Sequence, residues 1–234
     1  MDRFAGKVAL VSGGAGGIGS AVAERLEREG AVAVRADLAG GEGVEPCDVT
    51  DPESCRAVVA GVLEHHGRLD VLVNAAGVGG FWPITELAID DWQRVIAVNL
   101  TGTFVLSQSA IPALLETRGS IVNLASTAGL RATPFNAAYC ASKGGVIMLT
   151  RSIAVELASA GVRVNAVCPS AVDTPMLRGF AIPEGSEQLL ARNASPMGRV
   201  LDADEVAAAV AYLASADAAS VTGTALVVDG GATA

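Results

Sequence analysis

A glycine-rich turn between an apolar run and a helical pattern decides the fold of this chain. The stretch KVALVSGGAGGIG covers residues 7–19, and its first half, Lys7 to Ser12, has the continuous apolar character of a buried strand. Its five glycines permit backbone angles closed to other residues and a close approach to a pyrophosphate. The helix expected from Gly17 would direct free N–H groups at that phosphate. The glycines fit two registers, GxGxxG from Gly14 and SGxxxGIG from Ser12.

The rest of the chain repeats this strand–helix alternation. The expected strands are residues 7–12, 31–37, 69–74, 119–126, 162–168 and 224–230, with a short seventh at 44–47. The expected helices are residues 17–29, 52–66, 91–117, 137–160 and 202–215, and Pro112 predicts that the third of them bends or ends there. Because no linker or composition break interrupts the alternation, the sequence predicts an α/β fold: one doubly wound Rossmann domain over residues 1–234. Its sheet would be seven-stranded and mostly parallel, with helices on both faces.

The composition excludes several classes of protein. The 234 residues include 16 Lys and Arg against 25 Asp and Glu, for a net charge of −9, and 51% are hydrophobic. This balance argues against a nucleic-acid partner and against a disordered chain. No continuous apolar run approaches the ~18 residues of a membrane span, and the start does not resemble a signal peptide, so we expect a cytoplasmic protein with no membrane partner. The four cysteines lack CxxC spacing and a nearby His, which predicts reduced thiols and no metal site.

An acidic residue at the end of the second strand indicates which dinucleotide the turn would take. Asp37 follows the last glycine of the turn by 18 residues, as expected for a carboxylate that binds the adenosine ribose hydroxyls. A carboxylate repels a 2′-phosphate, and Leu38 and Ala15 provide no basic side chain to attract one. These features predict NAD as the cofactor rather than NADP. Arg35 argues against this preference for NAD, because it should share a strand face with Asp37, from which its side chain could reach a 2′-phosphate.

A second set of polar residues would meet at the carboxyl ends of the parallel strands. Tyr139 and Lys143 are four residues apart on one helix face, where the ammonium group can favour the phenolate. Ser126 and Asn74 end expected strands, at the edge of the sheet where such folds bind ligands. Asn99 stands within an apolar helical stretch, where a polar side chain needs a specific reason.

With these residues in view, the chain resembles the short-chain dehydrogenase/reductase family, of the single-domain type, over essentially its whole length. The matching segments are the turn from Ser12 to Gly19, Asp48-Val49, the NAAG run at 74–77, Asn99, Ser126, the YCASK run at 139–143, PSAVDT at 169–174 and TGTALVVDGG at 222–231. The resemblance implies an NAD-dependent oxidoreductase that transfers a hydride between a nicotinamide and a secondary alcohol or ketone.

The resemblance also assigns roles to residues. Ser126 would orient the substrate oxygen, Tyr139 would act as general acid or base, Lys143 would lower the pKa of Tyr139 and hold the nicotinamide ribose, and Asn99 would anchor a proton-relay water. The cofactor would be bound by Ser12, Gly13, Ala15, Gly16, Gly17, Ile18, Gly19, Asp37, Leu38, Asp48, Val49, Asn74, Ala75, Gly77, Val98, Tyr139, Lys143, Pro169, Val172 and Thr174.

One segment departs from the family pattern. The family usually places a helix between the second and third strands, but the run LAGGEGVEPC at 38–47 has three glycines and no helical periodicity. We therefore expect that helix to be missing and the adenine end of the cofactor to be more exposed.

A substrate pocket is expected beside the catalytic residues. Residues 170–201 have weak periodicity and three prolines, which is typical of a functional lid. Candidate pocket residues are Phe81, Trp82, Leu130, Phe135, Met176, Leu177 and Phe180. They are apolar, which favours an apolar substrate, although the same residues could form the lid core or a subunit interface. Apolar surface on the expected helices at 91–117 and 137–160, together with the resemblance, predicts a homotetramer.

Two alternatives remain at this stage. A ketoacyl reductase acting on an acyl carrier protein would need basic surface near the pocket, and Arg131 and Arg178 are placed to provide it. A non-catalytic NAD-binding regulator is the second alternative, although such a protein is expected to have lost catalytic groups that are all present here.

Overall fold

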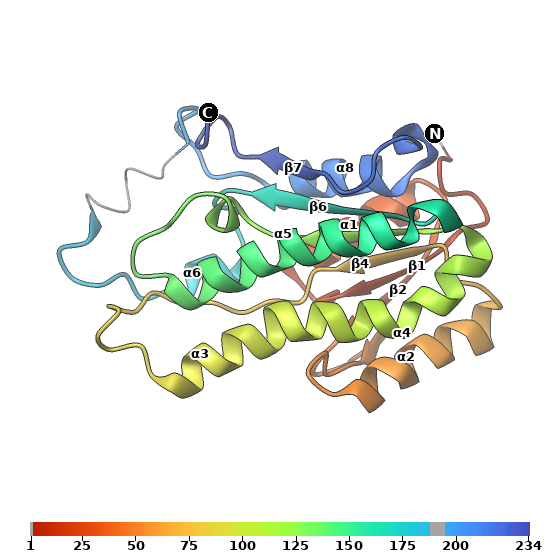
Figure 1. The fold of residues 1–234 in the computed structure, drawn as a ribbon, viewed down its shortest axis with the longest axis horizontal. Coiled ribbons are helices and arrows are strands. Elements are labelled where there is room, and N and C mark those ends of the chain that lie inside the picture. The colour runs from red at the N-terminus through yellow and green to blue at the C-terminus, as the bar shows by residue number, and fades with distance from the viewer. Residues whose placement is uncertain (1, 188–194) are drawn as a thin grey trace.

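Seven parallel strands form a single sheet in the computed structural model, which describes residues 2–187 and 195–234 (Figure 1). Their spatial order is β3-β2-β1-β4-β5-β6-β7, and every neighbouring pair is parallel. The strands are β1 (Val8–Ser12), β2 (Val32–Asp37), β3 (Val44–Pro46), β4 (Val71–Asn74), β5 (Ser120–Leu124), β6 (Arg163–Pro169) and β7 (Ala225–Val228). The predicted Rossmann architecture is confirmed, with a sheet that is parallel throughout.

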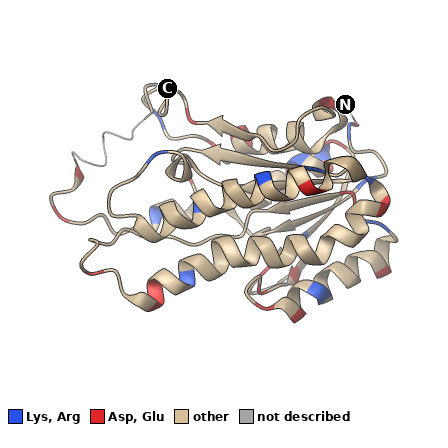
Figure 2. Cartoon of the chain, in the orientation of Figure 1, with Lys and Arg blue, Asp and Glu red and all other residues tan. Residues whose placement is uncertain are grey.

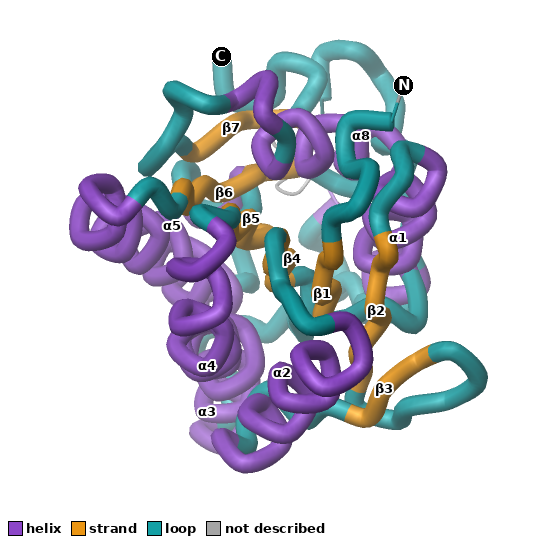
Figure 3. Tube along the Cα trace, turned by 90° about the vertical axis from the view of Figure 1, so that its right-hand side faces the viewer, coloured by secondary structure: helices purple, strands orange, loops and turns teal. Residues whose placement is uncertain are grey.

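Helices cover both faces of this sheet (Figure 3). One face carries α2 (Pro52–His66), α4 (Gly102–Thr117) and α5 (Ala137–Leu157), with α3 (Ile89–Ile96) packed on α5. The other face carries α1 (Gly17–Arg28) and α8 (Ala203–Ala214). The short α6 (Pro175–Arg178) follows β6. Each face has its own apolar core, and consecutive strand residues such as Leu10 and Val11 enter opposite cores. Because both faces are buried, the strands have continuous apolar sequences.

The long helical segment before β5 is interrupted at Asn99 and does not end at Pro112. After α3, the chain forms a π-helical stretch, Ala97–Thr101, and α4 then continues to Thr117 with Pro112 inside it. Of the two expectations for Pro112, a bend or a helix end, the helix end is therefore wrong, and the expected end of the helix near Thr117 is confirmed. A proline within a helix costs on the order of 3 kcal/mol, and the complete burial of Ala110 and Leu114 on either side offsets this cost.

The connection between β2 and β3 contains no helix, as the sequence predicts. Residues 38–43 form turns, and Gly41 pairs with Val44 in an isolated bridge. Gly40 and Gly43 have φ angles of 61° and 69°, which glycine adopts without strain. Leu38, directly after β2, is 70% exposed, so this short connection leaves the end of the strand uncovered.

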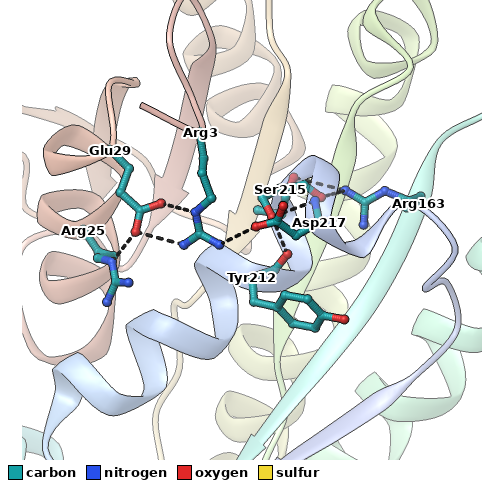
Figure 4. Close-up of polar contacts among 8 residues, drawn as sticks. Arg3, Arg25, Glu29, Arg163, Tyr212, Ser215 and Asp217 are labelled. Carbon is teal, nitrogen blue, oxygen red and sulfur yellow. Dashed lines mark hydrogen bonds and ion pairs between the residues drawn. The ribbon is translucent and has the colours of Figure 1, made fainter. Parts of the chain in front are cut away.

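A polar network ties the amino-terminal segment to α1 and α8 at the base of the sheet, away from the strands' carboxyl ends (Figure 4). Arg3 donates to Glu29 at 2.6 Å and to Asp217 at 3.1 Å. Arg163 donates to the carbonyl oxygens of residues 213–215 at 2.6, 3.1 and 3.0 Å. These carbonyls lie at the end of α8, where the helix itself offers no donors, so a cation there satisfies them.

The four cysteines, Cys47, Cys55, Cys140 and Cys168, are free thiols, and all but Cys140 are buried. One helical stretch of the described chain, Ile89–Thr117, matches a membrane span by its length and its mean hydropathy of 1.3. However, 44% of its most apolar window is buried in the fold, and a core helix of a globular protein passes the same test. Polar residues interrupt this stretch, so it is not a continuous apolar run in the sequence.

Candidate active site

A cleft of about 690 Å³ opens at the carboxyl ends of the central strands. The strand order reverses between β1 and β4, and open α/β sheets bind ligands at such a switch point. The lining includes the turn after β1, the ends of β2 and β4, the segment after β5, the start of α5 and the segment after β6. Segments far apart in sequence therefore meet in one cavity, which is large enough for a dinucleotide fragment and a small substrate.

The turn after β1 uses the SGxxxGIG register. Gly13 and Gly17 have φ angles of 68° and 55°, in the left-handed region that favours glycine. A Cβ atom on Gly19 would lie 2.0 Å from the carbonyl oxygen of Gly13, so only glycine permits α1 to start this close to the turn. The residue before α1 is Gly16, which has no side chain to cap the first N–H groups. These donors remain available for a phosphate, and the turn thus fits a pyrophosphate.

The Asp37 carboxylate is held at the edge of the cleft, beside the turn. Its Oδ2 accepts from the N–H of Ala15 at 3.1 Å, and its Oδ1 accepts from the N–H of Leu38 at 2.8 Å. Arg35, which could have reached a phosphate here, pairs instead with Glu27 at 2.8 Å.

The catalytic candidates converge on the same cavity. Ser126, Tyr139 and Lys143 all line the cleft. The Lys143 ammonium lies 5.6 Å from the centroid of the Tyr139 ring and donates to the carbonyl of Leu124 at 2.6 Å. The Ser126 hydroxyl accepts from the N–H of Ala128 at 3.1 Å, which fixes its oxygen at the end of β5. A phenol, a hydroxyl and a buried ammonium are thus arranged for proton transfer to a substrate oxygen.

Most of the predicted cofactor and catalytic residues line the cleft, and four of them do not. Gly13, Gly16, Gly17, Ile18, Gly19, Asp37, Leu38, Asp48, Val49, Ala75, Gly77, Val98, Tyr139, Lys143, Pro169, Val172 and Thr174 line it. Ser12 is buried behind this lining, and its hydroxyl accepts from the N–H of Ala76 at 3.4 Å. Ala15 is exposed, and its N–H donates to Asp37. Asn74 is buried and donates to Ser107 and Asn123 at 3.0 and 2.8 Å, so it joins β4 to its neighbours.

Asn99 is the fourth residue outside the lining, and its side chain holds the cleft wall together. Its Oδ1 accepts from the N–H of Val78 at 2.8 Å, while its Nδ2 donates to the Val78 carbonyl at 2.9 Å and to the Ser142 hydroxyl at 3.0 Å. The π-helical stretch turns this amide toward the segment after β4. The side chain is therefore committed to positioning, and a relay water would have to use the backbone of Asn99.

The substrate side of the cleft contains part of the predicted set. Phe81, Met176, Leu177 and Phe180 line it, and the Phe81 and Phe180 rings meet edge to face with centroids 5.3 Å apart. Trp82, Leu130 and Phe135 lie outside the lining. Trp82 packs over Gly80, where a Cβ would be 2.4 Å from the indole, and Leu130 is 45% exposed. Phe135 stands in a left-handed turn with φ of 61°.

Backbone pairing joins the two ends of the predicted lid, residues 170–201. Val172 pairs with Leu201, and the Leu201 N–H donates to the carbonyl of Ala171 at 3.0 Å. The short helix α6 and the residues up to 187 cover the cleft from one side through Met176, Leu177, Phe180 and Ile182. Residues 188–194 of the predicted lid lie outside the described residues.

Comparison with known proteins agrees with this geometry. A family model described as enoyl-(acyl carrier protein) reductase matches residues 13–233. The chain belongs to the short-chain dehydrogenase/reductase family. It is 41% identical to D-threitol dehydrogenase of Mycolicibacterium smegmatis, across 99% of this chain and 94% of the relative. It is also 41% identical to meso-2,3-butanediol dehydrogenase of Serratia marcescens, across 99% and 96%. The structure of a Brucella melitensis 3-ketoacyl-(acyl-carrier-protein) reductase complexed with NADH matches with a TM-score of 0.90 and 33% identity, covering 99% of this chain and 100% of that one.

Burial is the main influence on the pKa values of Tyr139 and Lys143 in this short-chain dehydrogenase/reductase. It raises the pKa of Tyr139 to about 12, although a hydrogen bond with Ser126 acts in the opposite direction. It also lowers the pKa of Lys143 to about 8, because a charged ammonium is poorly solvated there. In the ligand-free protein the effect of burial on the Tyr139 pKa therefore outweighs the groups that favour the phenolate. That Lys143 lowers this pKa, as the resemblance implied, stays a prediction.

Several lining residues were missed by sequence reasoning, and two of them lie just before Tyr139. Thr133 and Asn136 line the cleft shortly before Tyr139. Asn136 directly precedes α5, where an Asn normally caps the helix, but its side chain makes no capping bond. Its Oδ1 is buried without a partner, which costs about 1–3 kcal/mol unless a ligand or water satisfies it. The spacing offered one signal, because Asn136 precedes Tyr139 by three residues and so shares its helix face.

Proposed function

We propose that this enzyme is an NAD-dependent dehydrogenase that interconverts a secondary alcohol and a ketone. The observation that carries the proposal is the convergence of Ser126, Tyr139 and Lys143 on one cleft that also contains the glycine turn. The residues of the turn and Asp37 fit a dinucleotide, because Gly19 lets α1 start close to the turn and the first N–H groups of α1 have no side-chain cap. The names of two relatives, dehydrogenases of threitol and of 2,3-butanediol, support an alcohol as substrate.

The proposed mechanism divides the work among these side chains. When bound, the nicotinamide accepts or supplies the hydride. Ser126 donates a hydrogen bond to the substrate oxygen, and Tyr139 removes the alcohol proton or returns one to the ketone. Lys143 supplies positive charge near the phenol and binds the ribose. Asn99 flanks Gly77 together with Lys143, and its backbone would hold the water that relays the proton.

NAD is the proposed cofactor rather than NADP. The support is the Asp37 carboxylate at the cleft, because it would oppose a 2′-phosphate, and the ion pair that keeps Arg35 on Glu27. The Brucella melitensis reductase structure holds NADH, which is consistent with this preference. Comparing the dissociation constants of the two cofactors by fluorescence titration tests it. NADP binding as tight as NAD binding would contradict it.

A ketoacyl reductase is the second candidate, because one structural relative carries that name. It would need free cations near the entrance to attract an acidic carrier protein. Arg178 is instead paired with Asp173 through two bonds of 2.8 Å, and Arg131 donates to the carbonyl of Ala232 at 2.7 Å. Because both guanidinium groups already bond within the chain, a small free alcohol is favoured as substrate over one bound to an acidic carrier protein. A non-catalytic NAD-binding regulator is less favoured, because the whole catalytic set is present.

We further propose a cytoplasmic homotetramer. Between Gly102 and Thr117, α4 carries one charged residue, Glu116 (Figure 2). On α5, Met148 and Val155 are 60% and 81% exposed, which a subunit interface would cover. The edge strand β7 offers a second surface. Free thiols support a reducing compartment. A monomeric mass by light scattering at micromolar concentration would contradict the assembly.

The decisive experiment measures NADH formation from a panel of secondary alcohols, and NADH consumption with the matching ketones. We expect NAD-dependent turnover with at least one apolar secondary alcohol. If binding of NAD is observed but no alcohol or ketone in a broad panel reacts, the regulator would be the better description.

A further inference from the structure

The substrate side of the cleft combines an apolar lining with one uncommitted amide. Val78, Phe81, Met176, Leu177, Phe180 and Ile182 form the apolar part. Asn136 lines the same cavity and is 5% exposed. An apolar pocket with a few placed polar groups is typical of a site that recognises a small molecule by its oxygen atoms.

The amide of Asn136 has no structural task in the described chain. It does not cap α5, and its Oδ1 is buried without a hydrogen-bond partner. Across residues 2–187 and 195–234, no side-chain or backbone group bonds to its Nδ2 either. By contrast, the buried amide of Asn99 makes three hydrogen bonds within the chain. Buried amides are nearly always satisfied, so the partner of Asn136 is expected to come from outside the chain.

The backbone before Asn136 is fixed in an unusual conformation. Phe135 has a φ of 61°, which a bulky residue rarely adopts. Its carbonyl accepts from the N–H of Trp82 at 2.7 Å, so the segment after β4 holds this turn in place. Strained residues of this kind occur where a site must be positioned. The turn delivers Asn136 one helical turn before Tyr139, on the same face.

We propose that Asn136 binds a second oxygen of the substrate, on the carbon next to the reacting one. The substrate class is then a vicinal diol, oxidised to an α-hydroxyketone, with an otherwise apolar skeleton. The amide can donate to that oxygen and accept from its hydroxyl hydrogen, while Ser126 and Tyr139 hold the reacting oxygen. This inference rests on the proposed dehydrogenase function and adds to it the residue that selects among alcohols.

The test compares matched alcohols with and without the second oxygen. Initial rates are measured for meso-2,3-butanediol against 2-butanol, and for cyclohexane-1,2-diol against cyclohexanol, using the wild type, Asn136→Leu and Asn136→Ser. We expect kcat/KM of the wild type to favour each diol at least tenfold. In both variants kcat/KM for the diols should fall about tenfold or more, while the values for the simple alcohols change less than threefold. Thr133→Val, at another polar lining residue shortly before Tyr139, is the matched control and should retain the preference for diols.

Binding gives a second readout that does not depend on turnover. Quenching of bound NADH fluorescence reports the dissociation constant of each diol, which should rise about tenfold in Asn136→Leu, with the melting temperature and NADH affinity unchanged. Equal kcat/KM for diols and simple alcohols in the wild type would overturn this inference and leave the dehydrogenase function standing. A loss of diol preference in Thr133→Val but not in the Asn136 variants would also overturn it. If no alcohol of either kind reacts, the proposed function itself fails, and this inference fails with it.

Discussion

Replacing Tyr139 by Phe removes the oxygen that is expected to transfer the proton and leaves the ring in place. The ring packs against Gly79, where a Cβ would lie 3.0 Å from Cδ2, and Lys143 lies 5.6 Å from its centroid. Both contacts involve the ring, so Phe retains them. The hydroxyl contributes a hydrogen bond with Ser126. The free energy of unfolding should therefore change by no more than about 1 kcal/mol.

The effect on catalysis should be far larger than the effect on stability. A positioned general base contributes about 10²–10⁴-fold, or roughly 3–5 kcal/mol of activation free energy. Burial raises the pKa of Tyr139 to about 12, so the phenol is protonated in the ligand-free enzyme at neutral pH. Oxidation needs the phenolate, so its rate should rise with pH, whereas ketone reduction needs the phenol and should fall. Tyr139→Phe should lose this pH dependence together with turnover.

The assay measures kcat, its pH profile and NAD affinity for the wild type and Tyr139→Phe. Tyr212→Phe is the matched control: it changes the other tyrosine of the chain, on α8 outside the cleft lining, and should behave as wild type. Turnover of Tyr139→Phe within threefold of wild type would refute the assigned role. Loss of NAD binding in parallel with turnover would instead indicate that the residue supports the cofactor site.

Three further predictions concern the glycine turn, Asp37 and Glu29. Gly19→Ala should weaken NAD binding more than ~10-fold in fluorescence titrations, because its Cβ would lie 2.0 Å from the Gly13 oxygen; unchanged affinity would show that the turn can rearrange. Asp37→Ser should reduce the preference for NAD over NADP by ~10-fold, and an unchanged ratio would mean that another group sets it. Arg3 lowers the pKa of Glu29 from its ordinary 4.5 to about 2, so Glu29 stabilises the fold above pH 4.5 and this contribution disappears as the pH falls toward 2. In urea unfolding, Glu29→Gln should therefore cost on the order of 2–3 kcal/mol at pH 7 and much less near pH 2.5; an equal cost at both would exclude the ion pair as its cause.

The sequence by itself determined the architecture and the main chemical groups. Continuous apolar runs identify strands buried on both faces, and the glycines of residues 13–19 require a backbone that few other residues can adopt. Local composition also predicted the direct β2–β3 connection, because three glycines in ten residues cannot sustain a helix. These features depend on the conformational preferences of neighbouring residues and on the spacing of residues within one strand, helix or turn, and both can be read from the sequence.

Only the tertiary structure decided which of these residues face the cleft. Trp82 and Phe135 seemed equivalent to Phe81 by sequence, but packing over Gly80 and a left-handed turn direct them elsewhere. Asn99 was predicted to anchor a relay water, but its side-chain amide bonds to Val78 and Ser142, because a π-helical stretch directs it there. Whether a polar side chain is satisfied inside the protein depends on neighbours that are distant in the sequence. For that reason the free amide of Asn136, and the burial that sets the pKa values of Tyr139 and Lys143, became visible only once the chain was folded.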